Sequence, residues 1–330
     1  MDNIKNNEMN ARPVLSAVIS CYFEQESIDE FYHRLSLTLN KMNLPYEIIF
    51  VNDGSTDDTF QKLTEIFEKD PRVSCIINLF KNSGQSAGAT AGLSQAQGQH
   101  VIFMDSDLQF DPEELPVLYK SYTENNVDIT TGYRENRRDS LLRRLVSFLA
   151  NNLTRSASEV KIRDLGCTYR IINANLIRAF GLGPYNIINS FNIFQAADSI
   201  SEVSVSHHPR KYGKSGWSLM ALSDFNMENL INMMNRPFQY IVLALFLMGF
   251  LLIGRVALDF LFPVVIFKTV TMGFLLNIIL IGAFIQLAIL CLIGELVLRS
   301  LRTVKGKPQY IIKEKRRHHA LNHTTCAREI

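Results

Sequence analysis

Short apolar runs alternate with longer amphipathic stretches along the first part of the chain. Each run ends in polar or turn-forming residues, which is typical of buried strands. The predicted strands are Val14–Ile19, Tyr46–Val51, Val73–Phe80, Val101–Met104 and Val127–Tyr133. Helices are predicted over Glu26–Met42, Thr59–Lys69 and a small-residue stretch that begins at Gly84. Strand–helix alternation at this spacing predicts an α/β domain with a mostly parallel sheet.

Acidic residues follow three of these predicted strands. Glu24 lies shortly after the first strand, Asp53 follows the second, and Asp105 and Asp107 follow the fourth. Because the carboxyl ends of parallel strands meet at one edge, where open α/β sheets bind ligands, we expect one shared site. Carboxylate oxygens beside a nucleotide diphosphate are suitable Mg²⁺ ligands. An isolated D-x-D is weak evidence, and helix capping or turn formation is the alternative for Glu24 and Asp53.

Composition excludes several other classes of protein. No G-x-G-x-x-G or P-loop lysine is found, so the sequence supports neither dinucleotide nor P-loop binding. A net charge of +2, with no basic face interleaved with aromatics, gives no sign of a nucleic-acid partner. The five cysteines are scattered and form no C-x-x-C pair, so no disulfide framework or zinc site is indicated. The polar segment 1–13 lacks a signal-peptide core, so we expect a cytoplasmic main domain.

Apolar residues concentrate beyond residue 236. The stretch 238–262 contains only Arg255 and Asp259 as charges, and Thr269–Gly294 contains none. Both are long enough for helices that cross a hydrocarbon layer, which need about 20 residues. Because the tail 299–330 is basic and the connector carries only Lys268, we expect a transmembrane hairpin over 237–298 with both termini cytoplasmic.

A leucine stripe in 137–157 predicts an amphipathic helix, because Leu141, Leu145, Leu149 and Leu153 recur every four residues. Arg143 and Ser147 lie four residues apart on a different face. Such a helix can lie at a membrane surface, and an ordinary core-packing helix with solvated arginines is the alternative. The segment 218–236, rich in Leu, Met and Phe, is predicted to be a second interfacial helix leading into the membrane.

Several segments together resemble a known family. Tyr22 with Glu24, Val51–Ser55 and Asp105–Gln109 look like the inverting family 2 glycosyltransferases of the Rossmann-like GT-A fold. Three further segments are similar to the polyprenyl-phosphate glycosyltransferases: Gly132–Arg134, Asp164–Arg170 and Arg210–Ser215. That group includes dolichyl-phosphate mannose synthases and bacterial undecaprenyl-phosphate glucosyl and aminoarabinosyl transferases. The resemblance covers about residues 14–310. This chain departs from the family's usual residues at Ser20, Phe23 and Gly216.

The resemblance implies a GT-A domain over 14–217 and assigns roles to its residues. Implied contacts to the nucleotide sugar are Ser20, Tyr22, Glu24, Asp53, Gln85, Asp105 and Ser106. Asp107 and Gln109, with Asp105 beside them, would hold Mg²⁺ or Mn²⁺. The implied lipid-phosphate contacts are Arg134, Arg143, Ser147 and Arg210.

Asp164 occupies the position of the family's candidate catalytic base. A phosphate monoester has a second pKa near 6 and is mostly dianionic at neutral pH, so a base is not obligatory. The alternatives are that Asp164 orients an arginine or the acceptor sugar face, or forms a surface ion pair with Lys161 or Arg163.

The resulting prediction is an inverting transferase that moves a hexose from a nucleotide diphosphate sugar, UDP-glucose, to undecaprenyl phosphate at the inner membrane. A divalent metal and cationic side chains would stabilise the leaving diphosphate. The product would be a lipid-linked donor for cell-envelope glycans. Alternatives are a UDP-aminoarabinose or GDP-mannose homologue and an inactive membrane partner of such a pathway. A processive synthase is disfavoured because the sole tryptophan, Trp217, follows Lys-Ser-Gly instead of a Q-x-x-R sequence. The resemblance also implies a homo-oligomer, a tetramer with exchanged C-terminal segments.

Overall fold

The computed structural model describes residues 12–134, 162–164, 166–188, 190–212 and 308–318, with separate helical residues between 275 and 300. Contacts divide the chain into two compact units, Met1–Met233 with Pro308–Ile330, and Met234–Lys307. The predicted helix 137–157, with Arg143 and Ser147, lies outside the described residues, as do the segment 218–236 and the apolar run 238–262.

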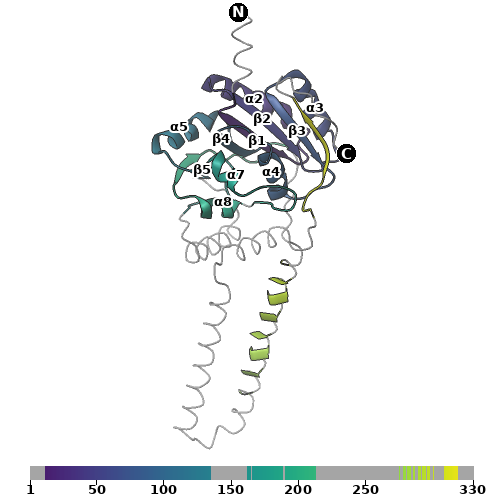
Figure 1. Cartoon of the computed structure of the whole chain (residues 1–330), viewed down its shortest axis with the longest axis vertical. Helices are drawn as coiled ribbons and strands as arrows, with labels where there is room; N and C mark the ends of the chain where they lie inside the picture. Colours follow the sequence, from purple (N-terminus) through teal and green to yellow (C-terminus); the bar gives the residue numbers. More distant parts are fainter. Residues whose placement is uncertain are drawn as a thin grey trace, which may run out of the picture. The chain divides into compact units, whose positions relative to one another are not determined.

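The first unit is built on one sheet, whose described strands run in the order β7-β5-β6-β4-β1-β2-β3-β8 (Figure 1). The strands are β1 (Leu15–Cys21), β2 (Tyr46–Asn52), β3 (Val73–Leu79), β4 (His100–Asp105), β5 (Ile129–Arg134), β6 (Arg170–Asn173), β7 (Ile200–Val205) and β8 (Ile312–Arg317). β1 pairs in parallel with β2 and β4, β2 with β3, and β5 with β7, whereas β6 and β8 are antiparallel to their neighbours. The carboxyl ends of β1, β2 and β4 therefore lie at the same edge of the sheet.

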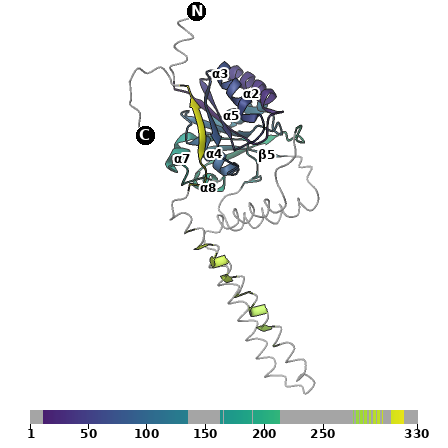
Figure 2. The same ribbon diagram turned by 90° about the vertical axis from the view of Figure 1, so that its right-hand side faces the viewer.

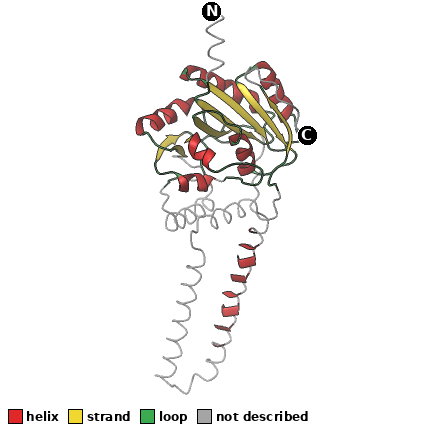
Figure 3. Cartoon of the chain, in the orientation of Figure 1, coloured by secondary structure: helices red, strands yellow, loops and turns green. Residues whose placement is uncertain are grey.

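Helices cover both faces of this sheet (Figures 2 and 3). The described helices of the unit are α2 (Ile28–Met42), α3 (Thr59–Lys69), α4 (Gln85–Leu93), the short 3₁₀ turn η1 (Pro112–Glu114), α5 (Leu115–Asn125), α7 (Ala174–Ala179) and α8 (Ser190–Ala196). One buried cluster lies between the sheet and α2, α3 and α5, and a second lies between the sheet and α4, α7 and α8. Ala17 and Ile19 of β1 belong to the first cluster and Val18 to the second, as the alternation of strand side chains requires.

This architecture confirms the predicted α/β, Rossmann-like fold and adds detail to it. The near-continuous apolar character of β1 and β2 suits strands buried on both faces. α2 and α5 end at Asn43 and Asn126 in the left-handed conformation, which asparagine tolerates. α4 packs close to β1 because its residues are small, and a Cβ on Gly88 would lie 2.6 Å from the Oγ of Ser20.

The strand β8 was not anticipated, because its sequence reads as part of a basic tail. Lys313 and Lys315 are exposed, whereas Tyr310, just before the strand, is buried in the second core cluster. β8 pairs antiparallel with β3 and covers that edge of the sheet.

The described residues include no helix that is both long enough and apolar enough to cross a membrane.

Candidate functional site

Two neighbouring strand ends bring the first polar groups together. In the register of β1 and β4, Ser20 lies directly beside Asp105, the last residue of β4. The Oγ of Ser106 lies 3.4 Å from both the backbone oxygen of Ser20 and the Sγ of Cys21. The predicted nucleotide-sugar contacts Ser20, Asp105 and Ser106 therefore meet at the carboxyl edge of the sheet.

Glu24 lies in the loop after β1, directly after Phe23, whose φ is 56°. Its backbone N–H donates to Oγ1 of Thr59 at 2.9 Å, and Ser27 donates a short hydrogen bond to its carboxylate. Glu24 is only 8 % exposed. The pKa of Glu24 is raised to about 7. Burial is the main cause and the negative charge of Asp107 adds to it, whereas the hydrogen bond from Ser27 acts in the opposite direction. This carboxyl group is therefore ready to accept a cation or donate a hydrogen bond at neutral pH.

Asp53 holds the loops after β2 and β3 together. Its carboxylate accepts the backbone N–H groups of Ser83, at 2.7 Å, and Gly84, at 3.0 Å. Burial raises the pKa of Asp53 to about 6 despite these hydrogen bonds. Gly54 has a φ of 68°, and a Cβ there would lie 2.2 Å from the carbonyl carbon of Lys81. The turn-forming role that sequence analysis left open for Asp53 is therefore present in the structure.

Asp105 is the best-connected carboxylate at this edge. Nε2 of Gln85 donates to its two oxygens at 3.0 and 3.3 Å, and Oγ1 of Thr168 donates at 2.9 Å. Burial, and then the negative charge of Asp107, raise its pKa to about 6. Gln85, predicted to contact the nucleotide sugar, thus lies against Asp105. Thr168 was not singled out by sequence analysis, although it belongs to the recognised 164–170 segment.

Asp107 lies next to an arginine from a distant part of the chain. Its Oδ1 accepts the backbone N–H of Gln109 at 3.1 Å, and its Oδ2 accepts Nη2 of Arg210 at 2.9 Å. The same Nη2 lies 3.9 Å from Oε1 of Glu24. The structure therefore brings two predicted donor-site carboxylates and one predicted lipid-phosphate contact, Arg210, into one cluster.

Arg134 and Asp164 form a second, separate pair. Nε and Nη2 of Arg134 donate to the two carboxylate oxygens of Asp164 at 2.6 and 2.8 Å, and Gly166 N–H donates to Oδ1 at 3.2 Å. The side chains are 14 % and 7 % exposed. Arg163, considered above as a surface partner of Asp164, instead pairs with Glu202 at 3.8 Å. Asp164 therefore contacts an arginine, and orientation of an arginine was one of the roles that sequence analysis left open for it.

Arg170 is a buried cation that sequence analysis did not single out. It is 1 % exposed, donates from Nη2 to the backbone oxygen of Cys167, and lies over the ring of Phe194 at 4.7 Å. Within the described part of the chain its Nε and Nη1 have no hydrogen-bond partner. Burial lowers its pKa, and its charge lowers the pKa of Asp105. Arg170 belongs to the segment 164–170 that carries the family resemblance, and that membership was the one signal in the sequence that pointed to it.

The described residues contain no cluster of three His, Cys, Asp or Glu side chains that would form a complete metal cage. The oxygen-rich set of Asp105, Asp107 and Gln109 nevertheless fits a divalent cation that takes its remaining ligands from substrate phosphates and water. Tyr22 stands 39 % exposed beside this edge of the sheet, with its ring against that of Phe23. Arg143 and Ser147 fall outside the described residues.

Comparisons with known proteins agree with this fold. Residues 16–179 match the family described as Glycosyl transferase family 2. The undecaprenyl-phosphate 4-deoxy-4-formamido-L-arabinose transferase of Serratia proteamaculans is 31 % identical over 315 residues, covering 91 % of this chain and 93 % of that protein. The dodecaprenyl-phosphate galacturonate synthase of Rhizobium johnstonii is 31 % identical over 209 residues, or 62 % of each chain.

A solved structure shows the same fold. Glucosyl-3-phosphoglycerate synthase from Mycobacterium tuberculosis, in complex with phosphoglyceric acid, has a TM-score of 0.50 and 18 % identity, covering 69 % of this chain and 82 % of that one. The α/β sheet with acidic strand ends is thus that of a family 2 glycosyltransferase. Within that family, the chain belongs to the polyprenyl-phosphate glycosyltransferases. The predicted family and enzyme class are confirmed.

Proposed function

We propose that this enzyme transfers a sugar from a nucleotide diphosphate sugar to undecaprenyl phosphate. The observation that carries the proposal is the convergence of Glu24, Asp105 and Asp107 with Arg210 at the carboxyl ends of β1 and β4. The names of the relatives supply the acceptor class, a polyprenyl phosphate. The inactive-partner alternative is disfavoured, because the relatives are named as a synthase and as transferases.

The donor half of the site consists of residues from the ends of β1, β2 and β4. In this proposal Tyr22, Glu24 and Asp53 contact the nucleoside, and Tyr22 offers an exposed aromatic face for the base. The diphosphate lies along the Asp105–Ser106 edge. Ser20 and Gln85 support that edge, because Ser20 lies beside Asp105 and Gln85 donates hydrogen bonds to it.

Asp107 and Gln109, with Asp105 beside them, would hold Mg²⁺ or Mn²⁺. A bound divalent cation would supply Lewis-acid stabilisation of the leaving diphosphate. Arg210 donates to Asp107 and therefore presents a guanidinium at the same edge, where negative charge develops on the leaving group.

The acceptor half of the site is assigned to cationic residues. The attacking oxygen belongs to a phosphate that is mostly dianionic at neutral pH, so the reaction does not need a proton acceptor. We therefore propose that Asp164 orients Arg134 and does not act as a base. Asp164 accepts two hydrogen bonds from the guanidinium of Arg134. Arg134 and Arg210, with Arg143 and Ser147, are the proposed contacts of the lipid phosphate.

The identity of the donor sugar is a separate proposal. The relatives are named for a formamido-arabinose and for galacturonate, and these names lend no support to the expected glucose. We propose a UDP-linked sugar of one of those two kinds, a modified pentose or a uronic acid.

Membrane attachment completes the proposal. The apolar runs 238–262 and Thr269–Gly294 would anchor the enzyme beside its lipid substrate, with the sheet domain and both termini in the cytoplasm. The homotetramer with exchanged C-terminal segments stays a prediction.

The experiment that tests the proposed function is a donor panel. The full chain, purified in detergent, would be incubated with undecaprenyl phosphate, Mn²⁺ and UDP-glucose, UDP-galacturonate, UDP-4-formamido-arabinose or GDP-mannose. We expect a lipid-linked sugar with one of the two middle donors, detected by mass spectrometry. A product with glucose alone would overturn the donor assignment, and no product with any donor would contradict the enzymatic proposal.

A further inference from the structure

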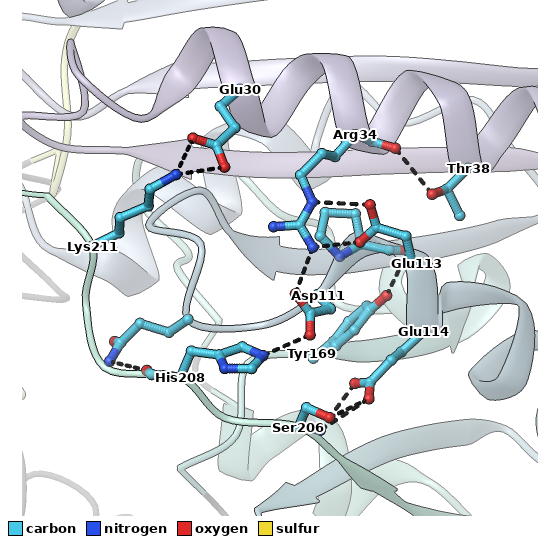
Figure 4. Close-up of polar contacts among 12 residues, drawn as sticks. Glu30, Arg34, Thr38, Asp111, Glu113, Glu114, Tyr169, Ser206, His208 and Lys211 are labelled. Atoms are coloured by element: carbon cyan, nitrogen blue, oxygen red, sulfur yellow. Dashed lines mark hydrogen bonds and ion pairs between the residues drawn. The ribbon is translucent and has the colours of Figure 1, made fainter.

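The residues 206–212, which follow β7, form a segment outside helices and strands that is fastened on both sides of Arg210. Arg210 is the member of this segment that reaches Asp107 and Glu24. The contacts of its neighbours in the segment are made with α2 and with the turn around η1 (Figure 4). Apart from Gln109, which is a proposed metal ligand, the residues that make these contacts have none of the roles assigned above.

On the N-terminal side of Arg210, the 206–212 segment is fastened to the residues that follow β4. The carboxylate of Glu114 accepts the N–H of Ser206 at 3.0 and 3.1 Å and its hydroxyl at 2.7 Å. Nε2 of His208 lies 2.7 Å from Oδ2 of Asp111. The backbone N–H of His208 donates to the backbone oxygen of Gln109 at 2.9 Å, and the Gln109 side chain donates back to the backbone oxygen of His208 at 3.3 Å.

On the C-terminal side, the segment is fastened to α2. Nζ of Lys211 donates to the two carboxylate oxygens of Glu30 at 2.7 and 3.0 Å, and the hydroxyl of Tyr212 lies 3.3 Å from the same carboxylate. Arg34, one helical turn beyond Glu30, bonds to Asp111 at 2.5 Å and to Glu113 at 2.6 and 2.9 Å. α2 thus holds the segment directly through Glu30 and also braces Asp111, the partner of His208.

These fastening contacts are partly exposed, and such ion pairs contribute little to global stability. Lys211 and Glu30 have side chains that are 53 % and 36 % exposed, and His208 is 53 % exposed. Their arrangement has a local consequence, because the contacts of His208, Lys211 and Tyr212 lie within two residues of Arg210 along the chain. A guanidinium that is held in place before the reaction stabilises developing charge without a further ordering cost.

We propose that Glu30 and Asp111 are positioning residues that act through Arg210. Glu30 binds Lys211, Asp111 binds His208, and together they keep the Arg210 guanidinium at the Asp107 edge, where phosphate oxygens of the substrates gather. The inference rests on the proposed function for its catalytic consequence, although the fastening itself is testable without activity.

The first measurement is limited proteolysis of the full chain in detergent. Trypsin cleaves after Arg210 and Lys211, and we expect the Glu30→Gln/Asp111→Asn variant to be cut there at least fivefold faster than the parent chain, with fragments identified by mass. Asp29→Asn is the matched control, because Asp29 is the neighbour of Glu30 on α2 and pairs with Lys62 of α3 instead of the segment. Equal cleavage of the double variant and the parent chain would overturn the proposal, whether or not the chain shows transferase activity.

The second measurement asks whether the effect passes through Arg210. Glu30→Gln/Asp111→Asn is expected to lower kcat about tenfold with little change in KM for the nucleotide sugar, and Asp29→Asn to leave both unchanged. In an Arg210→Gln background, the same two substitutions should cause less than a twofold further loss. A full additional tenfold loss would show that Glu30 and Asp111 act by another route and would refute the assignment. If the parent chain is inactive with all donors, the proposed function fails and the proteolysis result alone decides this inference.

Discussion

Two arginine–carboxylate pairs in the site differ in how firmly they are held. Arg134 and Asp164 share two hydrogen bonds of 2.6 and 2.8 Å, and both side chains are mostly buried, at 14 % and 7 % exposed. Arg210 and Asp107 share one hydrogen bond of 2.9 Å, and the Arg210 side chain is 31 % exposed. The first pair has the geometry of a fixed framework, and the second leaves its arginine more accessible to a ligand than Arg134 is.

The difference follows from where each arginine stands. Arg134 ends β5, a strand inside the sheet, and its fork matches both oxygens of one carboxylate, the strongest form of such a pair. Arg210 belongs to a segment with no regular structure and depends on its neighbours' contacts for its position. Removing one member of a buried ion pair is costly because the other member is left as an uncompensated buried charge. A more exposed arginine can exchange its carboxylate partner for water or phosphate at little cost.

The largest expected effect is on activity at the second pair. Asp107→Asn removes the charge that Arg210 and the proposed metal both need, and we expect kcat to fall roughly 1000-fold, about 4 kcal/mol of transition-state stabilisation. The measurement is the rate of lipid-linked sugar formation at saturating Mn²⁺.

The matched expectation for Asp107→Asn is that the fold is spared. Asparagine keeps an oxygen for the N–H of Gln109, and loss of one negative charge relieves Glu24 and Asp105, whose pKa values the charge of Asp107 raises. The free energy of unfolding should therefore change by less than about 1 kcal/mol. Wild-type activity of Asp107→Asn would show that Asp107 contributes neither to metal binding nor to stabilisation of the leaving group.

The first pair should respond in the opposite way. Asp164→Asn removes the carboxylate that compensates a mostly buried guanidinium, and we expect it to lower the free energy of unfolding by about 3 kcal/mol. Chemical denaturation of the purified chain measures this loss. Adding Arg134→Met to the Asp164→Asn chain should restore most of the lost free energy of unfolding, because no uncompensated guanidinium is then buried. Unchanged stability of the single variant would mean that Arg134 and Asp164 are not a framework pair.

Sequence reasoning predicted that the acidic residues of the proposed donor site meet at one edge of the sheet, because the signals for that edge are local. Glu24, Asp53 and Asp105 each lie at or just beyond the end of a predicted strand, and the parallel sheet brings such ends to one edge. The observed helix Thr59–Lys69 has the predicted bounds, and the strands differ from prediction by one or two residues at their ends. Apolar periodicity was sufficient for these elements.

Partners far apart in the sequence could not be found in this way. Arg210 and Asp107 are 103 residues apart, and a single sequence carries no signal that pairs them. Arg170 is a charged residue in a short strand, and its burial depends on Phe194 and on neighbours that only the fold brings close. β8 was missed for a related reason, because its lysines are the exposed positions of an edge strand and make the segment read as a solvated tail.

The smallest expected effect concerns Glu24, the second carboxylate near Arg210. Its pKa is about 7 in the folded chain, against an ordinary value of 4.5, because burial disfavours the charged form. Between these values the folded state holds a proton that the unfolded chain releases, so the contribution of Glu24 to stability is largest below pH 4.5 and declines as pH rises to 7. Glu24→Gln lacks this decline. In metal-free buffer its free energy of unfolding, relative to the parent chain, should rise by on the order of 2 kcal/mol between pH 4.5 and pH 8. If the free energies of unfolding of the two chains differ by a constant amount across that pH range, the raised pKa of Glu24 is contradicted. Glu24 would then be charged already at low pH, with its charge fully compensated by Arg210.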